Sequence, residues 1–343
     1  MTPPTLGEEA YRSAGVDVQA GRRAVELIMD VAGRAGRPEV IGGIGGFAGA
    51  FRLGDGRVLV AATDGVGTKI EVARLAGRLH SVGIDLVAMS VNDVVCTGAE
   101  PLFFLDYLAV GRLIPEEVAA IVGGVAEGCR RARCALLGGE TAEHPGTLEA
   151  DRFDLAGFCV GVVEEQALLG PDRVRRGDRL LGLPSTGLHS NGFSLVRRML
   201  LSDGDLSLTQ HVDALGRTLG DELLEPTAIY VDPVRALVGA GVARAAAHIS
   251  GGGWNENVPR ALPPGLGARV DVAAWTPQPI FDLISREAGL NREELFYVLN
   301  MGIGMVVVVA RDHEGRAMDL CEAAGVRAVV VGDVVEGSGV KLV

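Results

Sequence analysis

RVLVAATDGVGTK, residues 57–69, joins an apolar run to a glycine-containing turn and decides the fold of the first half of the chain. The aliphatic and β-branched residues at 57–63 predict a buried strand that runs directly into the turn. Outward from this strand, helix-like and strand-like segments alternate. Helices are predicted at 21–36, 83–99 and 115–132, and strands at 101–110, 134–143 and 153–163. This order is typical of an α+β domain, in which helices cover one face of a mixed sheet.

The second half of the chain shows the same mixture after a weak stretch near 165–175. Strands are predicted at 179–185, 268–272, 301–310 and 327–336, and helices at 226–240, 278–288 and 312–324. A length of 343 residues exceeds one ordinary domain. We therefore predict an N-terminal domain at 1–169 and a C-terminal domain at 170–343. Residues 1–20 have little periodicity and predict an arm or loop.

The composition argues against several classes of partner. A formal net charge of −12 disfavours nucleic acid, which normally requires a basic surface. The sequence has no apolar run suited to a signal peptide and no uncharged stretch long enough for a membrane span. The five cysteines lie in apolar contexts without zinc-ligand spacing, as expected of reduced thiols. We expect a cytoplasmic protein with no nucleic-acid or membrane partner.

The turn DGVGTK carries the first candidate site. Gly65 and Gly67 allow the backbone to approach a ligand closely. Asp64 can hold a divalent cation, and Thr68 and Lys69 can meet phosphate oxygens. The spacing differs from that of a Walker A loop, and a tight turn with a solvated lysine is the alternative interpretation.

Two other glycine-rich segments offer backbone N–H groups to an anion. IGGIGGF at 41–47 includes Gly45 and Gly46, although a flexible loop has the same composition. HISGGGWNENVPR at 248–260 places a glycine triplet before a predicted helix start, an arrangement that binds phosphate groups. A turn that only caps the helix is equally compatible with the second pattern.

Carboxylates inside apolar or glycine-rich segments form a further group of candidates. Asn92 and Asp93 lie in the predicted helix at 83–99, where unpaired polar groups are costly to bury. Either a core hydrogen-bond network or a Mg²⁺ site shared with Asp64 would satisfy them. In LLGGETAEHPG at 136–146, nucleotide or metal contact and plain loop polarity both remain open. Asp106, within a predicted strand, is another buried-carboxylate candidate.

STGLHSNGFSLVR at 185–197 is the fifth candidate segment. His189 can exchange protons near neutral pH, and Ser190 and Asn191 offer hydrogen bonds beside glycines. A lone histidine is usually structural, but this cluster in one loop favours a functional role.

Taken in order, these segments closely resemble the aminoimidazole ribonucleotide synthetase family, the phosphoribosylformylglycinamidine cyclo-ligases. Ten collinear segments between about residues 11 and 305 carry the resemblance, among them RPEVIGGIGGFAGAF, TDGVGTK, GIDLVAMSVNDVVCTGAEPLFFLDY, GLHSNGFSLVR and HISGGGWNENVPR. Phe193 and Trp254 stand where relatives often carry Tyr and Phe, which preserves an aromatic residue at each position.

The resemblance implies two α/β domains and a homodimer whose N-terminal sheets pair into a barrel. It implies that ATP and formylglycinamidine ribonucleotide, with Mg²⁺, give aminoimidazole ribonucleotide, ADP and phosphate through an imidate phosphate. In this reaction Lys69, Asp64 and His189 are assigned catalytic roles, and Asp64 and Asp93 are assigned to the metal. The residues assigned to the nucleotide are Gly45, Gly46, Gly65, Gly67, Thr68, Lys69, Gly138, Gly139, Glu140 and Thr141. The residues assigned to the substrate are Ser190, Asn191, Gly251, Gly252, Gly253, Asn257 and Arg260.

The nearest alternatives belong to the same superfamily: selenophosphate synthetase, thiamine monophosphate kinase, the hydrogenase-maturation dehydratase and formylglycinamidine synthetase. Selenium chemistry needs a reactive cysteine near the N-terminus, whereas the first cysteine here is Cys96, and the dehydratase uses a C-terminal cysteine where this chain reads KLV. A regulatory module without catalysis would carry a broken TDGVGTK or HSNG motif, and both are intact.

Overall fold

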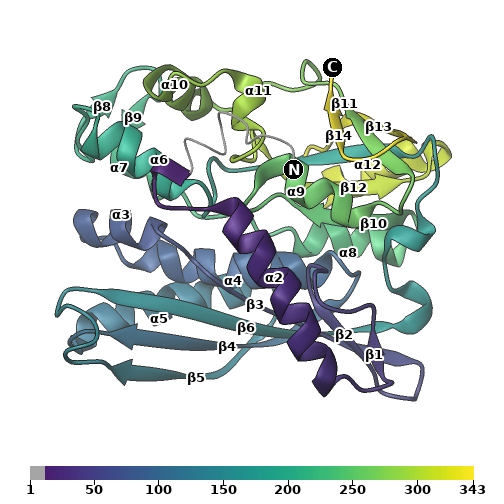
Figure 1. Ribbon diagram of the computed structural model, residues 1–343, viewed down its shortest axis with the longest axis horizontal. Coiled ribbons are helices and arrows are strands. Elements are labelled where there is room, and N and C mark those ends of the chain that lie inside the picture. The colour runs from purple at the N-terminus through teal and green to yellow at the C-terminus, as the bar shows by residue number, and fades with distance from the viewer. Residues whose placement is uncertain (1–11) are drawn as a thin grey trace.

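The computed structural model describes residues 12–343, which form two domains stacked on one another (Figure 1). Each domain contains a six-stranded mixed sheet with helices on a face, so the predicted α+β class is confirmed. The predicted arm at 1–20 lies partly outside the described residues. It is wrong at its end, because helix α2 already begins at Val18 and runs to Ala32.

The N-terminal sheet has the strand order β1-β2-β3-β6-β4-β5. Its strands are β1 (Val40–Ile41), β2 (Gly49–Arg52), β3 (Arg57–Gly65), β4 (Glu100–Val110), β5 (Ala135–Glu143) and β6 (Phe153–Glu164). All neighbouring strands are antiparallel except β4 and β5, which are parallel. Helices α3 (Lys69–Ala76), α4 (His80–Val95) and α5 (Pro115–Arg131) accompany this sheet, and α4 packs against both β3 and β6.

The C-terminal sheet has the strand order β10-β12-β7-β13-β11-β14. Its strands are β7 (Arg179–Pro184), β10 (Ala243–His248), β11 (Leu266–Val270), β12 (Ile303–Val309), β13 (Val329–Glu336) and β14 (Val340–Leu342). The longer helices are α8 (Val231–Gly239), α10 (Pro279–Ala288) and α12 (Glu314–Ala323). Short elements complete the domain: the hairpin β8 (His211–Val212) and β9 (Arg217–Thr218), and helices α6 (Phe193–Arg197), α7 (Leu219–Leu223), α9 (Gly253–Asn257) and α11 (Arg292–Leu295).

Helix α4 forms the layer between the N-terminal sheet and the C-terminal domain. Almost all of it is buried, because it is apolar on every side and contacts α5, β3, β6, α8 and β10. Its closest neighbour is α5, and glycines on both helices allow the close approach. An added Cβ on Gly83 would lie 2.2 Å from the carbonyl oxygen of Ile121, and one on Gly124 would lie 1.9 Å from that of His80.

Most of the predicted elements are confirmed, with shifted ends. The predicted helix at 83–99 begins earlier and ends at Val95, and the predicted helix at 226–240 begins only at Val231. Helix α3, which starts at Lys69, was not predicted from the sequence, nor were the short strands β1 and β2 on either side of the glycine-rich segment. The predicted boundary at 169/170 falls between the two sheets and stays a prediction.

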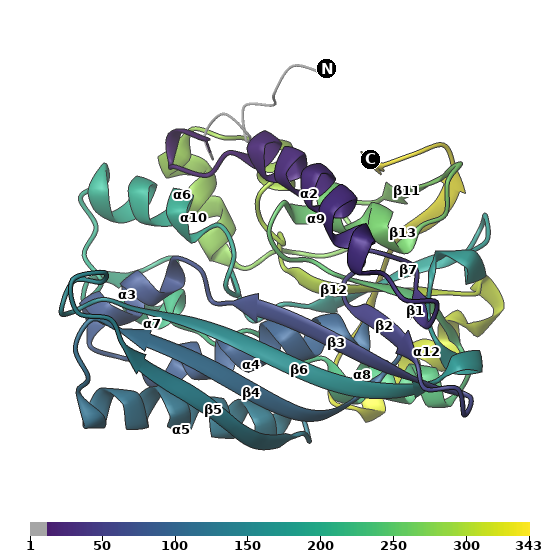
Figure 2. The ribbon, with the colours of Figure 1, turned by 60° about the horizontal axis from the view of Figure 1, so that its bottom comes forward.

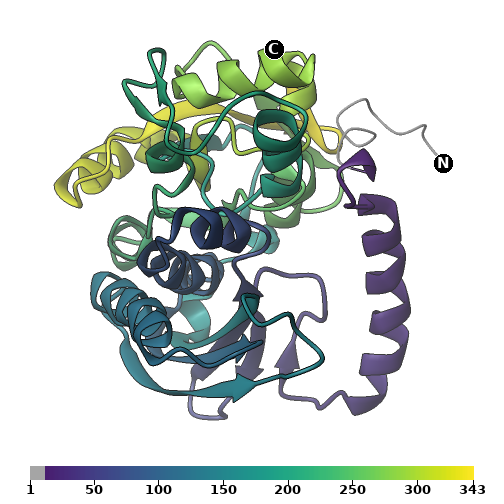
Figure 3. The ribbon, with the colours of Figure 1, turned by 90° about the vertical axis from the view of Figure 1, so that its left-hand side faces the viewer.

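Two apolar surfaces of the N-terminal domain have no cover within the described chain. No helix lies in front of the outer face of the sheet in Figure 2, where Tyr107 and Phe158 are 40% and 41% exposed. Helix α2 stands at the side of the molecule in Figure 3, and Leu27 and Ile28 on it are about half exposed. Among residues 12–343, no helix is both long and apolar enough to cross a membrane.

Candidate functional site

Two carboxylates and a histidine meet where the domains face each other. Asp64 stands near the end of β3, Asp93 lies in the last turn of α4, and His248 ends β10. His248 Nδ1 lies 2.9 Å from Asp93 Oδ1, and this imidazole is fully buried with no hydrogen-bond partner for Nε2. Burial, followed by the charge of Asp93, raises the pKa of Asp64 to about 6. The two carboxylates are therefore close enough to repel each other in a partly desolvated site.

This pair suits a hard divalent cation. Mg²⁺ in phosphoryl-transfer sites is usually bound through one or two carboxylates and the phosphates of the ligand. Asp64 and Asp93 supply such oxygens, and a cation would counter both the burial and the repulsion by Asp93 that raise the Asp64 pKa. Within residues 12–343, no set of three or more His, Cys, Asp or Glu side chains is arranged as a complete metal site. A metal here would accordingly take its other ligands from water and substrate.

Lys69, which the sequence predicts to meet phosphate oxygens, is directed into the interior of the protein. As the first residue of α3, it points into the protein and is fully buried. Its Nζ donates to Asp85 Oδ1 at 3.0 Å and to the carbonyl oxygens of His189 at 3.0 Å and Glu225 at 2.7 Å. All three ammonium protons thus have acceptors. In this conformation the ammonium group has no donor left for a phosphate.

His189 is also buried, in a loop that joins β7 to α6. It has a positive φ of 61°, which is uncommon for a residue other than glycine. Its Nε2 accepts hydrogen bonds from the backbone N–H groups of Thr186 at 3.2 Å and Ala228 at 3.3 Å. Burial, then the charges of His248 and Lys69, hold the His189 pKa well below its ordinary value. The ring is therefore neutral at pH 7, with its proton on Nδ1.

Three predicted loops come together at the domain junction. A Cβ on Gly67 would lie 3.8 Å from the carbonyl oxygen of Ser190. Thr68 Oγ1 lies 3.1 Å from Ser194 Oγ. On the other side, a Cβ on Gly251 would lie 3.5 Å from Asn191 Oδ1. The TDGVGTK, HSNG and HISGGG segments are thus neighbours in space, although Thr63 and Gly251 are 188 positions apart in the sequence.

Asn257, which is assigned to the substrate, makes its hydrogen bonds within the protein. The Asn257 amide donates to the carbonyl oxygens of Ser250, Gly251 and Gly253, at 3.3, 3.1 and 2.8 Å. This fixes the glycine triplet, in which Gly252 and Gly253 have φ values of 84° and 59°. Asn257 is 1% exposed, so it can hold the loop but cannot reach a ligand without moving.

Arg260 connects the C-terminal domain to the N-terminal glycine-rich segment. Its guanidinium donates to the carbonyl oxygens of Gly45 and Gly46, at 3.2 and 2.5 Å, and to Asn257 Oδ1 at 3.1 Å. It also lies 3.8 Å above the ring of Phe47. The segment assigned to the nucleotide is therefore held against the domain assigned to the substrate.

A pocket of about 280 Å³ opens beside this connection. It is lined by the glycine-rich segment, the end of α4, the stretch between the two sheets and β10; these residues include Gly46, Phe47, Thr97, Leu169, Ala246 and Arg260. Thr97 follows Asp93 by four residues, so this wall of the pocket lies at the Asp93 end of α4. Its walls are mainly apolar, with Arg260 as the cationic residue.

The predicted nucleotide residues Gly138, Gly139, Glu140 and Thr141 are not part of this cluster. They lie on the edge strand β5, where Gly139 pairs with Asp106, Asp106 with Gly157, and Gly157 with Asp64. Three strand spacings of about 4.8 Å separate them from Asp64, or ~14 Å. Within one chain the structure does not bring them to the carboxylates.

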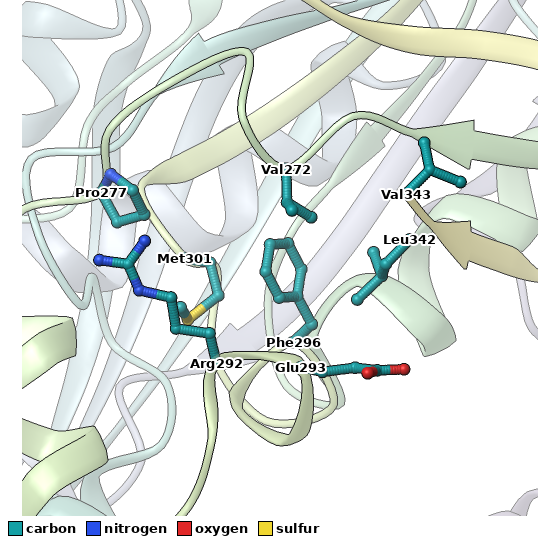
Figure 4. Close-up of a pocket in the computed structure, with 8 residues that line it drawn as sticks. All are labelled: Val272, Pro277, Arg292, Glu293, Phe296, Met301, Leu342 and Val343. Carbon is teal, nitrogen blue, oxygen red and sulfur yellow. The ribbon is translucent and has the colours of Figure 1, made fainter.

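A second pocket, of about 230 Å³, lies on the C-terminal domain (Figure 4). Apolar side chains surround the ring of Phe296, among them Val272, Met301 and Leu342. Arg292 lies at its rim and is paired with Asp282 at 2.7 Å. None of the predicted site residues lines this pocket.

Several residues that shape the site were not predicted from the sequence. Asp85 and Thr227 hold Lys69 and the His189 loop, and His248 is the partner of Asp93. A signal existed for Asp85, because it is a carboxylate in an apolar helix. Of the two alternatives stated for this segment, Asn92 shows the core network, because it bonds the Ala228 carbonyl and the Tyr230 N–H, whereas the metal role of Asp93 stays a prediction.

Two protein-family models cover most of the chain. The model described as "AIR synthase related protein, N-terminal domain" matches residues 45–163, and "AIR synthase related protein, C-terminal domain" matches residues 175–343. Phosphoribosylformylglycinamidine cyclo-ligase of Myxococcus xanthus is 52% identical over 333 residues, covering 96% of both chains. That of Shouchella clausii is 51% identical over 334 residues, covering 96% of this chain and 97% of the relative.

Solved structures share the fold at lower identity. Protein tt0281 of Thermus thermophilus has a TM-score of 0.68 at 22% identity, covering 94% of this chain and 95% of that one. AaThiL in complex with AMPPCP and TMP has a TM-score of 0.64 at 17% identity, covering 92% of both chains. These likenesses concern the fold alone, whereas the sequence relatives identify the family.

Proposed function

The chain belongs to the phosphoribosylformylglycinamidine cyclo-ligase family, and from this premise we propose how the junction between its domains serves the reaction. The enzyme is an ATP-dependent cyclo-ligase of purine biosynthesis. It converts formylglycinamidine ribonucleotide and ATP to aminoimidazole ribonucleotide, ADP and phosphate. The observation that carries the site proposal is the meeting of Asp64 and Asp93 with three glycine-bearing loops from both domains.

The chemistry requires activation of a formamide oxygen, which is a poor leaving group. We propose that this oxygen attacks the γ-phosphorus of ATP, forming an imidate phosphate as ADP leaves. The ribose-bearing nitrogen then attacks the formyl carbon that carries this oxygen. The ring closes, and phosphate departs with the former formyl oxygen. Such a reaction is accelerated chiefly by positioning and by neutralising phosphate charge.

The backbone of Gly65 and Gly67, with the hydroxyl of Thr68, would bind the triphosphate beside the carboxylate pair. Asp64 and Asp93 would hold Mg²⁺, which neutralises phosphate charge when bound. The segment with Gly45 and Gly46, which lines the pocket beside Arg260, would cover the bound nucleotide. Its attachment through Arg260 supports this arrangement.

The loop at Gly251–Gly253 would bind the 5′-phosphate of the ribonucleotide, with Asn191 beside it. Support comes from the amide of Asn257, which holds the loop carbonyls inward. Ser190 is bonded to Thr227, its hydroxyl oxygen 2.9 Å away, so its assignment to the substrate requires a change of partner. A role for His189 in moving a proton likewise requires the loop to open, because both its burial and its neutral state oppose proton release in this conformation.

We propose that the enzyme is a cytoplasmic homodimer. The uncovered sheet face, with Tyr107 and Phe158, is apolar enough to need a partner. Pairing of two such faces would form the barrel implied by the family resemblance. It would also bring β5 of a second copy toward the domain junction, where Gly138–Thr141 of that copy would contact the nucleotide.

The test is conversion of the acyclic ribonucleotide by the purified enzyme with Mg·ATP. We expect aminoimidazole ribonucleotide and ADP in equal amounts, and ADP formation that depends on the ribonucleotide. Asp93→Asn should raise the Mg²⁺ concentration needed for half-maximal rate by at least about tenfold, with Asp205→Asn, an exposed carboxylate, as the control. ADP release without imidazole product would refute the function, and an unchanged Mg²⁺ requirement would remove Asp93 from the metal site.

A further inference from the structure

Lys69 is a completely buried charge with three hydrogen bonds, and these bonds cross from one domain to the other. Lys69 and Asp85 come from α3 and α4 of the N-terminal domain, and both side chains are completely buried. Asp85 Oδ2 lies 2.8 Å from Nζ, and Oδ1 accepts a hydrogen bond from it at 3.0 Å. The remaining contacts of this pair are with the C-terminal domain.

The contacts of Lys69 and Asp85 with the C-terminal domain involve two loops, at residues 185–191 and 225–228. Lys69 donates to the carbonyl oxygens of His189 and Glu225. Asp85 Oδ1 accepts from both the N–H and the hydroxyl of Thr227, each at 2.7 Å. The Thr227 hydroxyl oxygen is also 2.9 Å from Ser190 Oγ. The pair thus binds the 185–191 loop and the 225–228 loop to each other and to α4.

The loop held in this way includes a residue under backbone strain. His189 has a φ of 61°, and a non-glycine residue keeps such a conformation only when its surroundings enforce it. The hydrogen bond from Lys69 to the His189 carbonyl and the one from Ala228 N–H to His189 Nε2 act on both sides of this residue. Asn191, two residues further on, faces the Gly251 loop.

We infer that the Lys69–Asp85 pair is a buried interdomain pin, and that Lys69 is a positioning residue that holds the HSN loop in place and does not bind a phosphate of ATP. The inference rests on the proposed function, since it concerns the same site. A lysine that served ATP would need its ammonium protons free or facing the cleft. Here they are shared among one carboxylate and two carbonyl oxygens.

The two roles predict different responses to removing the partner. Lys69→Met leaves Asp85 as an unpaired buried carboxylate, which disrupts both loops. Adding Asp85→Asn removes that charge, while the amide oxygen can still accept from Thr227. If Lys69 positions the loop, the double variant regains at least about tenfold in kcat over Lys69→Met. If Lys69 binds phosphate, the double variant is as slow as the single one, and the KM for ATP is raised in both.

A pair at the surface provides the matched control. Arg78 of the N-terminal domain and Asp221 of the C-terminal domain form an ion pair of 2.6 Å, with side chains 51% and 44% exposed. Arg78→Met should change kcat and both KM values by less than about twofold, because exposed pairs contribute little. A large loss in this variant would mean that any contact between the domains has the same effect, which contradicts the special role of the buried pair.

Thr227 gives a test that does not depend on the folding of Lys69→Met. Thr227→Val keeps the shape but removes the hydroxyl that bonds Asp85 and Ser190, whereas Thr227→Ser keeps it. We expect Thr227→Val to lose about tenfold in kcat with the KM for ATP within about twofold of wild type, and Thr227→Ser to be close to wild type. Equal kcat values for Thr227→Val and wild type overturn the inference. Absence of imidazole product from the wild-type enzyme would instead refute the proposed function.

Discussion

At the scale of single residues, burial decides what the candidate side chains can do. Asp64 and Lys69 stand five positions apart in one motif, yet Asp64 is only partly buried, beside Asp93, while Lys69 points into the interior. The strand β3 and the start of α3 hold them in different directions. A motif therefore does not assign one role to all of its polar members. The carboxylate remains available to a ligand, and the lysine does not.

Asp64 predicts a measurable pH dependence of stability in the metal-free protein. Its folded-state pKa of about 6 lies above the ordinary value of 3.8. A raised carboxyl pKa stabilises the folded state fully only at low pH, and this contribution is lost as the pH rises through 6. Asp64→Asn should therefore raise the unfolding free energy at pH 7, by up to roughly 3 kcal/mol, with the gain disappearing near pH 4. Denaturant unfolding in EDTA between pH 4 and 8 measures this.

The control for this prediction is Asp205→Asn, at an exposed position, which should leave the pH profile unchanged. A wild-type and an Asp64→Asn protein with parallel profiles across the whole range would contradict a desolvated Asp64.

At the scale of elements, close approach sets which glycines are required. Helices α4 and α5 form one of the most extensive pairs of the fold, and backbone atoms of one helix occupy the place that a side chain on the other would take. Adjacent glycines on α5 differ in this respect. Gly124 faces His80 of α4, whereas a Cβ on Gly123 would meet only the edge of the His80 ring, at 3.7 Å.

These two glycines predict opposite effects of the same substitution. Gly124→Ala places a methyl group 1.9 Å from the His80 carbonyl oxygen and should destabilise the protein by about 1–3 kcal/mol or more, because α4 and α5 must separate. Gly123→Ala should stabilise it by about 0.5–1 kcal/mol through helix propensity. Thermal unfolding of both variants checks the order. If both lose stability equally, the packing described for α5 is wrong.

The Arg260 connection makes a second prediction at this scale, about the segment before β2. Arg260→Ala removes the donors to Gly45 and Gly46 and the stacking on Phe47. Amide exchange at residues 42–47 should become at least about tenfold faster, since few other contacts hold the segment. Hydrogen exchange followed by mass spectrometry measures this. Arg37→Ala, which removes a contact with Phe51 on the neighbouring strand, should leave these residues unchanged, and unaltered exchange in Arg260→Ala would contradict the connection.

At the scale of the whole molecule, the two faces of the N-terminal sheet have different surroundings. Val60, Cys159 and Leu108 are buried on the face toward α4 and α5. The opposite face carries Tyr107 and Phe158 with about two fifths of their surface exposed. An uncovered apolar sheet is a common place for association, and the same sheet carries Asp64 and the Gly138–Thr141 strand.

The exposed apolar face of the N-terminal sheet predicts that a charged side chain placed on it prevents association. Phe158→Arg should convert the proposed homodimer to a monomer and lower kcat by at least about tenfold, because the nucleotide site would lose the strand that we propose a second copy supplies. Light scattering after size-exclusion chromatography gives the mass. Leu75→Arg, at a residue of α3 that is 57% exposed, is the control and should remain a dimer. A monomeric wild-type enzyme with full activity would contradict both the dimer and the proposed role of β5.

The sequence alone determined the family and the α+β class, and it marked three of the loops that meet at the domain junction. Strand and helix periodicity is local, so β3, β4, α5 and β12 could be predicted to within a few residues, and glycine-bearing motifs marked the loops. Only the tertiary structure decided the partners of the polar groups. Lys69 finds Glu225, Asp93 finds His248, and Asp85 finds Thr227 across 156, 155 and 142 residues respectively. Contacts so distant in the chain depend on how the domains stack, because no local pattern specifies which buried acceptor a buried donor will meet.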